Sequence, residues 1–317
     1  MATRLLFFIA ALRALAAIAI TNSHYEGVYP TDLIANGGLV GDVLFFAVSG
    51  YCLQEIKLDF RSWYCKRLLR IFPAVWIITL IYQFLGVYKI NTPVDYFSFY
   101  FWPTKYHFVG SIVLLYMPFF FICKYAKTEK HLKKVISGVF LFQIMLYITV
   151  YNYSYYHIDT VREPMIWFLF LEAMLLGAYF RIKVNRQPLN KVHFFYWVGI
   201  AGLICIYFIS KLSFVHIPKM APWQIINQIF LLILLFCLFR GFTGLEFYFS
   251  TLGKYPKKII TYLADRTLEI YLVQYVIIAE INIGKFPLNW FLITFSILFS
   301  AHILHEMSVW ITRRINI

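Results

Sequence analysis

Long apolar runs recur through this sequence and constrain its fold more than any other feature. A helix rises about 1.5 Å per residue, so about 20 residues cross the roughly 30 Å hydrocarbon core of a bilayer. We therefore predict an all-α polytopic membrane protein with about ten transmembrane helices. The predicted spans cover residues 5–22, 39–54, 71–88, 108–123, 135–151, 165–180, 194–210, 223–239, 263–282 and 289–311. Acidic and basic residues interrupt the ninth run, which makes it the weakest of the ten.

Composition agrees with a membrane protein, because 61% of the residues are hydrophobic and only 14% are charged. Soluble domains carry about 25% charged residues. The net charge of +14 could indicate a nucleic-acid partner, but most basic residues fall in alternate loops, on one side of the predicted spans. Such loops are cytoplasmic in membrane proteins, so we place both termini in the cytoplasm and expect no nucleic acid as a partner. The expected location is the cell membrane, with the bacterial cytoplasmic membrane favoured.

The chain shows no internal repeat and no low-complexity segment. Its longest connection between predicted spans is about twenty residues, too short for an additional folded unit. We therefore expect residues 1–317 to form a single integral-membrane domain with no appended soluble domain.

The first apolar run contains an arginine and ends in a histidine. Arg13 and His24 are eleven positions apart, so they fall on nearly the same helix face, about 16 Å apart along the axis. An arginine inside an apolar span normally faces a protein interior or a wet cavity. Histidine titrates near neutrality and suits a general base, although an interfacial histidine that only reaches towards water remains an alternative.

Two acidic residues are candidate partners for this histidine. Glu26 follows it in the first outer loop. Asp42 lies near the outer end of the second span, whose glycines allow close approach of a neighbouring helix or a ligand. Asp42 is expected either to orient His24 or to pair with Arg13.

A pair of arginines precedes the third predicted span. Arg67 and Arg70 are three residues apart and can share a helix face, which suits a two-armed clamp for phosphate groups. Ordinary cytoplasmic topology also places basic residues there. Pro73 can bend or break the helix just beyond them, which favours a functional role.

Taken together, these stretches resemble the acyltransferase-3 family, multi-pass membrane proteins that acylate hydroxyls of cell-surface glycans. The strongest similarity lies in residues 13–24, 38–51 and 63–76, and weaker similarity continues in 176–179 and 267–274. The resemblance implies functional roles for Arg13, His24, Arg67 and Arg70. Two positions depart from the pattern: Val43 stands where many members have aspartate, with Asp42 one place earlier, and Gln274 stands where many have histidine.

The resemblance and the residue chemistry together predict a membrane O-acyltransferase, most simply an O-acetyltransferase. Arg67 and Arg70 would bind the phosphates of cytoplasmic acetyl-CoA, or another acyl-CoA, and Arg13 would line the path of the acyl donor. His24 would act as general base, with Asp42 or Glu26 as its partner. The expected acceptor is a surface glycan or a lipid-linked sugar precursor, among membrane lipids and other polysaccharide-assembly proteins.

Other functions remain open at this point. A transporter or flippase for an anionic substrate or a glycan intermediate would also need polar residues within spans, although paired inverted halves are not visible. A glycan polymerase or glycosyltransferase would need a large acidic outer loop. A non-catalytic assembly subunit would tolerate loss of His24.

Further polar residues lie within the later spans. Glu172 is deep in the sixth span, where we consider Arg13 as a partner. His302, His305 and Glu306 share one face of the last span, and we predict an interhelical polar cluster rather than a metal site. No metal is expected.

Overall fold

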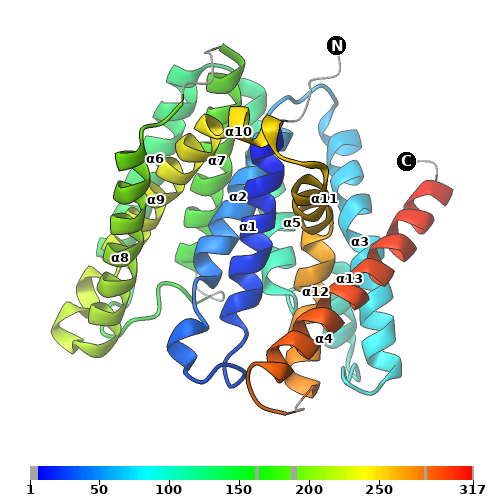
Figure 1. Cartoon of the computed structure of the whole chain (residues 1–317). Helices are drawn as coiled ribbons and strands as arrows, with labels where there is room; N and C mark the ends of the chain where they lie inside the picture. Colours follow the sequence, from blue (N-terminus) through cyan, green and yellow to red (C-terminus); the bar gives the residue numbers. More distant parts are fainter. Residues whose placement is uncertain (1–5, 161–163, 187–190, 282–283, 316–317) are drawn as a thin grey trace. The chain divides into compact units, whose positions relative to one another are not determined.

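The computed structural model describes residues 6–160, 164–186, 191–281 and 284–315, and within these ranges all regular structure is helical (Figure 1). The α-helices are α1 (Phe7–Ser23), α2 (Gly38–Leu53), α3 (Phe60–Phe84), α4 (Pro93–Tyr96), α5 (His107–Tyr125), α6 (Glu129–Thr149), α7 (Pro164–Arg186), α8 (Phe194–His216), α9 (Ile225–Gly244), α10 (Glu246–Thr251), α11 (Lys254–Asp265), α12 (Thr267–Glu280) and α13 (Leu288–Arg314). Three short helical turns are η1 (Asp32–Ile34), η2 (Phe97–Phe101) and η3 (Pro218–Trp223).

Eight helices in the described part of the chain are long and apolar enough to cross a membrane. They are α2, α3, α5, α6, α7, α8, α9 and α13. The other two predicted spans correspond to α1, an apolar helix of 17 residues, and to α12, which has 14 residues. The prediction of an all-α, multi-pass membrane protein is confirmed.

The helix that contains the third predicted span begins earlier in the sequence than predicted. Helix α3 starts at Phe60, because the Asp59 carboxylate accepts a 2.9 Å hydrogen bond from the Ser62 backbone N–H and caps the first turn. That bond lowers the pKa of Asp59. The helix then runs through Pro73 to Phe84 without a break. Arg67 and Arg70 therefore lie within α3, and Pro73 does not break this helix.

The chain divides into two compact units, each made of three segments. Unit 1 comprises Met1–Leu12, Val43–Ile56 and Pro118–Ile260, and unit 2 comprises Arg13–Asp42, Lys57–Met117 and Thr261–Ile317.

In unit 1, α7 packs against α6 and α9, and α9 packs against α8 (Figure 1). The second half of α2 approaches α7 closely at two glycines. A β-carbon on Gly50 would meet the backbone of Met174, and one on Gly177 would meet the backbone of Ala47. Phe46 and Phe170 stack beside these contacts, with ring centroids 4.2 Å apart. The close packing of the second half of α2 against α7 therefore depends on the glycines at these two positions.

Glu172 lies in the most buried span of unit 1 and is 1% exposed. Neither of its carboxylate oxygens has a hydrogen-bond partner among the described residues. The pairing with Arg13 considered from the sequence stays a prediction, because Arg13 belongs to unit 2.

In unit 2, α3, α12 and α13 pack against one another. Polar pairs join α13 to the start of α12. His305 Nδ1 lies 3.0 Å from a carboxylate oxygen of Glu269, and the Arg266 guanidinium donates to Glu306 at 3.3 Å and to His302 at 3.3 Å. The polar face predicted for the last span thus forms an interhelical cluster. No group of three or more potential metal ligands is found among the described residues.

Candidate active site

All six site residues predicted from the sequence fall in unit 2. They are Arg13, His24, Glu26, Asp42, Arg67 and Arg70. His24 directly follows the last residue of α1, where the backbone leaves the helix and its N–H donates to the carbonyl of Thr21 at 3.1 Å. The imidazole thus occupies the end of an apolar helix rather than a freely moving loop.

Two adjacent residues of α12 hold the end of α1. The Thr21 hydroxyl donates a 2.6 Å hydrogen bond to the side-chain oxygen of Gln274, and both residues are buried. The neighbouring Tyr275 meets the ring of His24 edge-on, with centroids 6.2 Å apart and an angle of 83° between the planes. These contacts, one helical turn apart on α1, position the imidazole relative to α12.

Burial lowers the pKa of His24 below its usual value of 6.5, and the nearby charge of Glu26 partly opposes that shift. The imidazole is therefore predominantly neutral at pH 7 and can accept a proton. Glu26 itself is exposed. Of the two acids considered from the sequence, Glu26 is the one whose charge acts on His24.

Asp42 interacts with a different group. Its carboxyl lies within electrostatic range of the hydroxyl of Tyr271 on α12. That hydroxyl accepts a 3.3 Å hydrogen bond from the backbone N–H of Phe108, and the two rings lie 5.1 Å apart. Tyr271 thus contacts the first turn of α5, and the charge of Asp42 acts on its hydroxyl.

The amide of Gln274 is a site feature that the residue chemistry did not identify. Gln274 is 1% exposed, and its side-chain nitrogen has no hydrogen-bond partner among the described residues. A buried amide with an unused donor is costly, and such groups often reflect a functional role. The only sequence signal was the departure from histidine at this position.

Several tyrosines lie near Gln274 and the start of α5, namely Tyr82, Tyr88, Tyr106, Tyr271 and Tyr275. The ring of Tyr88 lies 5.3 Å from that of Tyr82 and 6.2 Å from that of Tyr106. The Tyr82 hydroxyl donates to the carbonyl of Val273, next to Gln274. Burial raises the pKa of Tyr106, so its hydroxyl keeps its proton.

The arginine pair occupies the first half of α3. The Arg67 guanidinium lies over the ring of Trp63, 5.6 Å from its centroid, and Trp63 is buried against Tyr116. Arg67 is half-buried, whereas Arg70 is exposed. The stacked guanidinium keeps its orientation, and the exposed one can move towards a ligand. Arg13, in α1, is also half-buried.

Comparison with known proteins identifies the family of the chain. The model of a family described as an acyltransferase domain matches residues 6–304. A 75-residue stretch is 32% identical to "Putative peptidoglycan O-acetyltransferase YrhL" of Bacillus subtilis (strain 168). This stretch is 21% of the chain and spans only 11% of that protein's length. No solved structure matches. Since the family match extends over residues 6–304, nearly the whole chain, the chain belongs to the acyltransferase-3 family.

Proposed function

We propose that this protein is a membrane O-acyltransferase that moves an acetyl group from cytoplasmic acetyl-CoA to a hydroxyl of an extracytoplasmic glycan. The observation that carries the proposal is the position of His24, whose ring is held against α12 and whose pKa is lowered by burial. A neutral, oriented imidazole is what general-base attack by a hydroxyl requires.

In the proposed reaction, His24 accepts the proton of the acceptor hydroxyl while the hydroxyl oxygen attacks the thioester carbonyl. The carbonyl oxygen gains negative charge, and the carbon–sulfur bond then breaks. The leaving thiolate takes the proton from the imidazolium, which gives coenzyme A and the O-acyl ester. Glu26 stabilises the imidazolium during this step, because its charge favours the protonated ring.

Gln274 is our candidate for stabilising the developing oxyanion. Its unused side-chain nitrogen is a donor, and its neighbours on α12 and α1 contact the His24 region. Amide side chains serve this role in other acyl-transfer sites, where each donor contributes about 10²–10³-fold in rate. Asp42, held in range of Tyr271, then has a positioning role between α2 and α12.

The donor's phosphates are assigned to the arginine pair. Arg67, stacked on Trp63, supplies a fixed planar group, and Arg70 supplies a second guanidinium three residues later. Guanidinium groups bind phosphates through paired hydrogen bonds. In the topology predicted from the sequence, Arg13 lies in the middle of the first span, between the cytoplasmic side and His24 at the outer end. We therefore assign Arg13 to the path of the acyl donor.

The acceptor and the surroundings complete the proposal. Because the B. subtilis relative is named for peptidoglycan, a cell-wall glycan or its lipid-linked precursor is the acceptor we propose. We propose that the protein spans the bacterial cytoplasmic membrane with both termini in the cytoplasm, among lipids and polysaccharide-assembly partners. We further propose that the two units act as one acyltransferase domain, because the family match runs through both.

The experiment uses membranes that contain the full chain and acetyl-CoA labelled in its acetyl group. Wild-type membranes are expected to label surface glycan, and His24→Ala should reduce labelling about 10²–10⁴-fold, the usual contribution of a general base. His216→Ala is the matched control, because His216 is exposed and also ends an apolar helix. Equal labelling by wild type and His24→Ala would refute the role of His24, and no labelling by wild type would refute acetyl transfer to glycan.

A further inference from the structure

Two lysines from neighbouring helices of unit 1 lie against the same tyrosine ring. The ammonium group of Lys133, on α6, is 5.4 Å from the ring centroid of Tyr179, and that of Lys183, on α7, is 5.9 Å from it. Tyr179 is only 6% exposed, so its ring is a fixed part of the packed pair of helices α6 and α7. A tyrosine ring attracts a cation, but two like charges at one ring also repel each other. A bound anion would remove that repulsion.

The surface around the two lysines has an excess of positive charge. In the part of the chain that the structure describes, the first two turns of α6 and the last turn of α7 carry five basic residues and one acid. The basic residues are Lys130, Lys133, Lys134, Lys183 and Arg186, and the acid is Glu129. None of the five forms an ion pair with a described acid. Arg181, by contrast, is paired with Glu55 at 3.0 Å. The five cations are therefore available to a negatively charged ligand.

The hydroxyl of Tyr179 adds an uncharged donor to the two lysines. It makes no hydrogen bond with any other described residue. A phosphate group accepts hydrogen bonds from ammonium groups and from hydroxyls. The ring thus brings together two cations and one hydroxyl, a set of donors that suits a phosphate.

The predicted spans place these groups at the depth of the lipid phosphates. The fifth predicted span begins at residue 135 and the sixth ends at residue 180. Tyr179 therefore lies at the edge of the apolar core, and Lys133 and Lys183 lie just outside it. In the predicted topology this edge faces the cytoplasm. Tyrosine rings are enriched at that depth, and lysines next to the membrane attract anionic lipids.

An exposed apolar stripe of α6 begins next to the lysines and continues towards the membrane interior. Only 17% of the residues in the apolar stretch of α6 are buried, against 78% for α7. Gly138, Leu141, Met145 and Ile148 follow Lys134 at spacings of three and four residues, so they share its helix face, and all are exposed. A β-carbon on Gly138 would meet nothing within 4 Å. This side of the helix is therefore open to an acyl chain.

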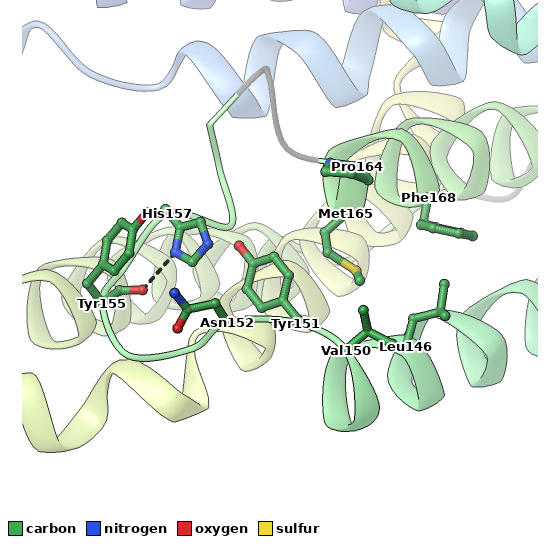
Figure 2. A pocket seen from close by; sticks show the side chains of 9 residues that line it. All are labelled: Leu146, Val150, Tyr151, Asn152, Tyr155, His157, Pro164, Met165 and Phe168. Atoms are coloured by element: carbon green, nitrogen blue, oxygen red, sulfur yellow. Dashed lines mark hydrogen bonds between the residues drawn. The ribbon is translucent and has the colours of Figure 1, made fainter.

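The opposite ends of the same two helices carry no such charge. A pocket of about 460 Å³ opens where α6 ends and α7 begins, and no lysine, arginine or acid lines it. Figure 2 shows the uncharged side chains of Met165 and Phe168 among its walls. Of the two ends of this helix pair, the cytoplasmic end is therefore the one that matches a negatively charged headgroup.

From these observations we propose that the cytoplasmic ends of α6 and α7 form a binding site for an anionic phospholipid of the phosphatidylglycerol type. The lipid phosphate contacts Lys133, Lys183 and the Tyr179 hydroxyl, and one acyl chain lies along the stripe that begins at Lys134. A zwitterionic headgroup fits less well, because the lysines repel its own cation. Topology alone explains lysines at these helix ends, but it does not require two of them at one ring beside an open apolar stripe.

The test measures binding of phosphatidylglycerol to the full chain by native mass spectrometry, with phosphatidylcholine of the same acyl chains as the reference lipid. Wild type should bind its first phosphatidylglycerol about tenfold tighter than phosphatidylcholine. Lys133→Gln combined with Lys183→Gln should weaken phosphatidylglycerol binding about tenfold and remove this preference. Lys124→Gln combined with Lys127→Gln is the matched control, because both lysines are exposed and Lys124 also lies over an aromatic ring. This control removes the same charge and should stay within about threefold of wild type.

Tyr179→Phe keeps the ring and removes the hydroxyl, so it should bind phosphatidylglycerol about three- to tenfold more weakly. Equal affinity of wild type for the two lipids, or equal loss in both double variants, would overturn the proposal. So would displacement of the lipid by inorganic phosphate or adenosine 3′,5′-bisphosphate, because the cations would then bind a soluble anion. His24 belongs to unit 2, so His24→Ala should bind phosphatidylglycerol as wild type does while losing acyl transfer. Lipid binding without any acyl transfer by wild type would refute the proposed function and support the lipid site.

Discussion

The hydroxyl of Thr21 donates a 2.6 Å hydrogen bond to the side-chain oxygen of Gln274, and these two residues are 253 positions apart in the sequence. The bond joins the first apolar helix to α12, one turn before His24. Both side chains are buried, so the bond cannot be replaced by water without opening the contact. The position of the imidazole depends on this long-range contact as well as on the helix that carries it.

The first prediction concerns this hydrogen bond. Thr21→Val keeps the shape of the side chain but leaves both ends of the Gln274 amide without a partner, which costs about 1–3 kcal/mol. We expect a lower midpoint of thermal unfolding for the protein in nanodiscs, together with reduced acyl transfer. Thr21→Ser retains the hydroxyl and should remain close to wild type in both measurements. A Thr21→Val protein as stable as wild type would show that the bond contributes little.

The pH dependence of acyl transfer gives the second prediction. Because burial lowers the pKa of His24, the acidic limb of the kcat/KM profile should have its midpoint below 6.5, with activity rising as the imidazole loses its proton. Glu26→Gln removes the charge that opposes this shift, so the midpoint should move to lower pH. Glu280→Gln, at an exposed acid at the end of α12, should leave the profile unchanged. Movement of the Glu26→Gln midpoint to higher pH would contradict the assigned electrostatics.

Much of this fold was predictable because a membrane imposes one simple rule. A span must be long, apolar and helical, so hydropathy predicts spans without knowledge of their neighbours. Hydropathy predicts the ends of helices less well where charged residues or a capping side chain decide them. The charged residues at 265, 266 and 269 led us to expect one interrupted span, whereas the structure has two helices, α11 and α12, that meet at Arg266. Because Asp59 caps the helix, α3 begins at Phe60, before the apolar run from which the span was predicted.

The site was only partly predictable, because its residues meet through contacts between distant segments. The sequence identified Glu26 and Asp42 as candidate partners of His24, but neither spacing nor composition indicates which acid acts on it. Nor could it indicate that Gln274 lies one turn from the end of α1, since that contact depends on how α12 packs. Nor does the sequence indicate the surroundings of Glu172, whose carboxylate oxygens have no hydrogen bond among the described residues.

Packing of α2 against α7 leads to the third prediction. Gly177→Ala places a methyl group against the backbone of Ala47, which cannot move away as a flexible side chain could. The helices must separate, and we expect a destabilisation of about 1–3 kcal/mol from overpacking. Gly199→Ala is the matched control: Gly199 is also helical, and nothing lies within 4 Å of the added carbon. Thermal unfolding of the two variants in nanodiscs should therefore differ in sign or in size, and equal midpoints would argue against the close approach of α2 to α7.

The last prediction concerns the arginine that lies over Trp63. Arg67→Lys keeps the positive charge but loses the planar group that can stack on the indole and bind phosphate through paired hydrogen bonds. Such charge-assisted bonds contribute about 1.5–3 kcal/mol, so the KM for acetyl-CoA should rise by about 10- to 100-fold. The kcat should change by less than about threefold, because a phosphate contact acts equally in the ground state and the transition state. Arg61→Lys, at an exposed position of the same helix, controls for the loss of a guanidinium near the membrane surface. A fall in kcat with unchanged KM would place Arg67 at the reacting group and contradict its assignment to the donor's phosphates.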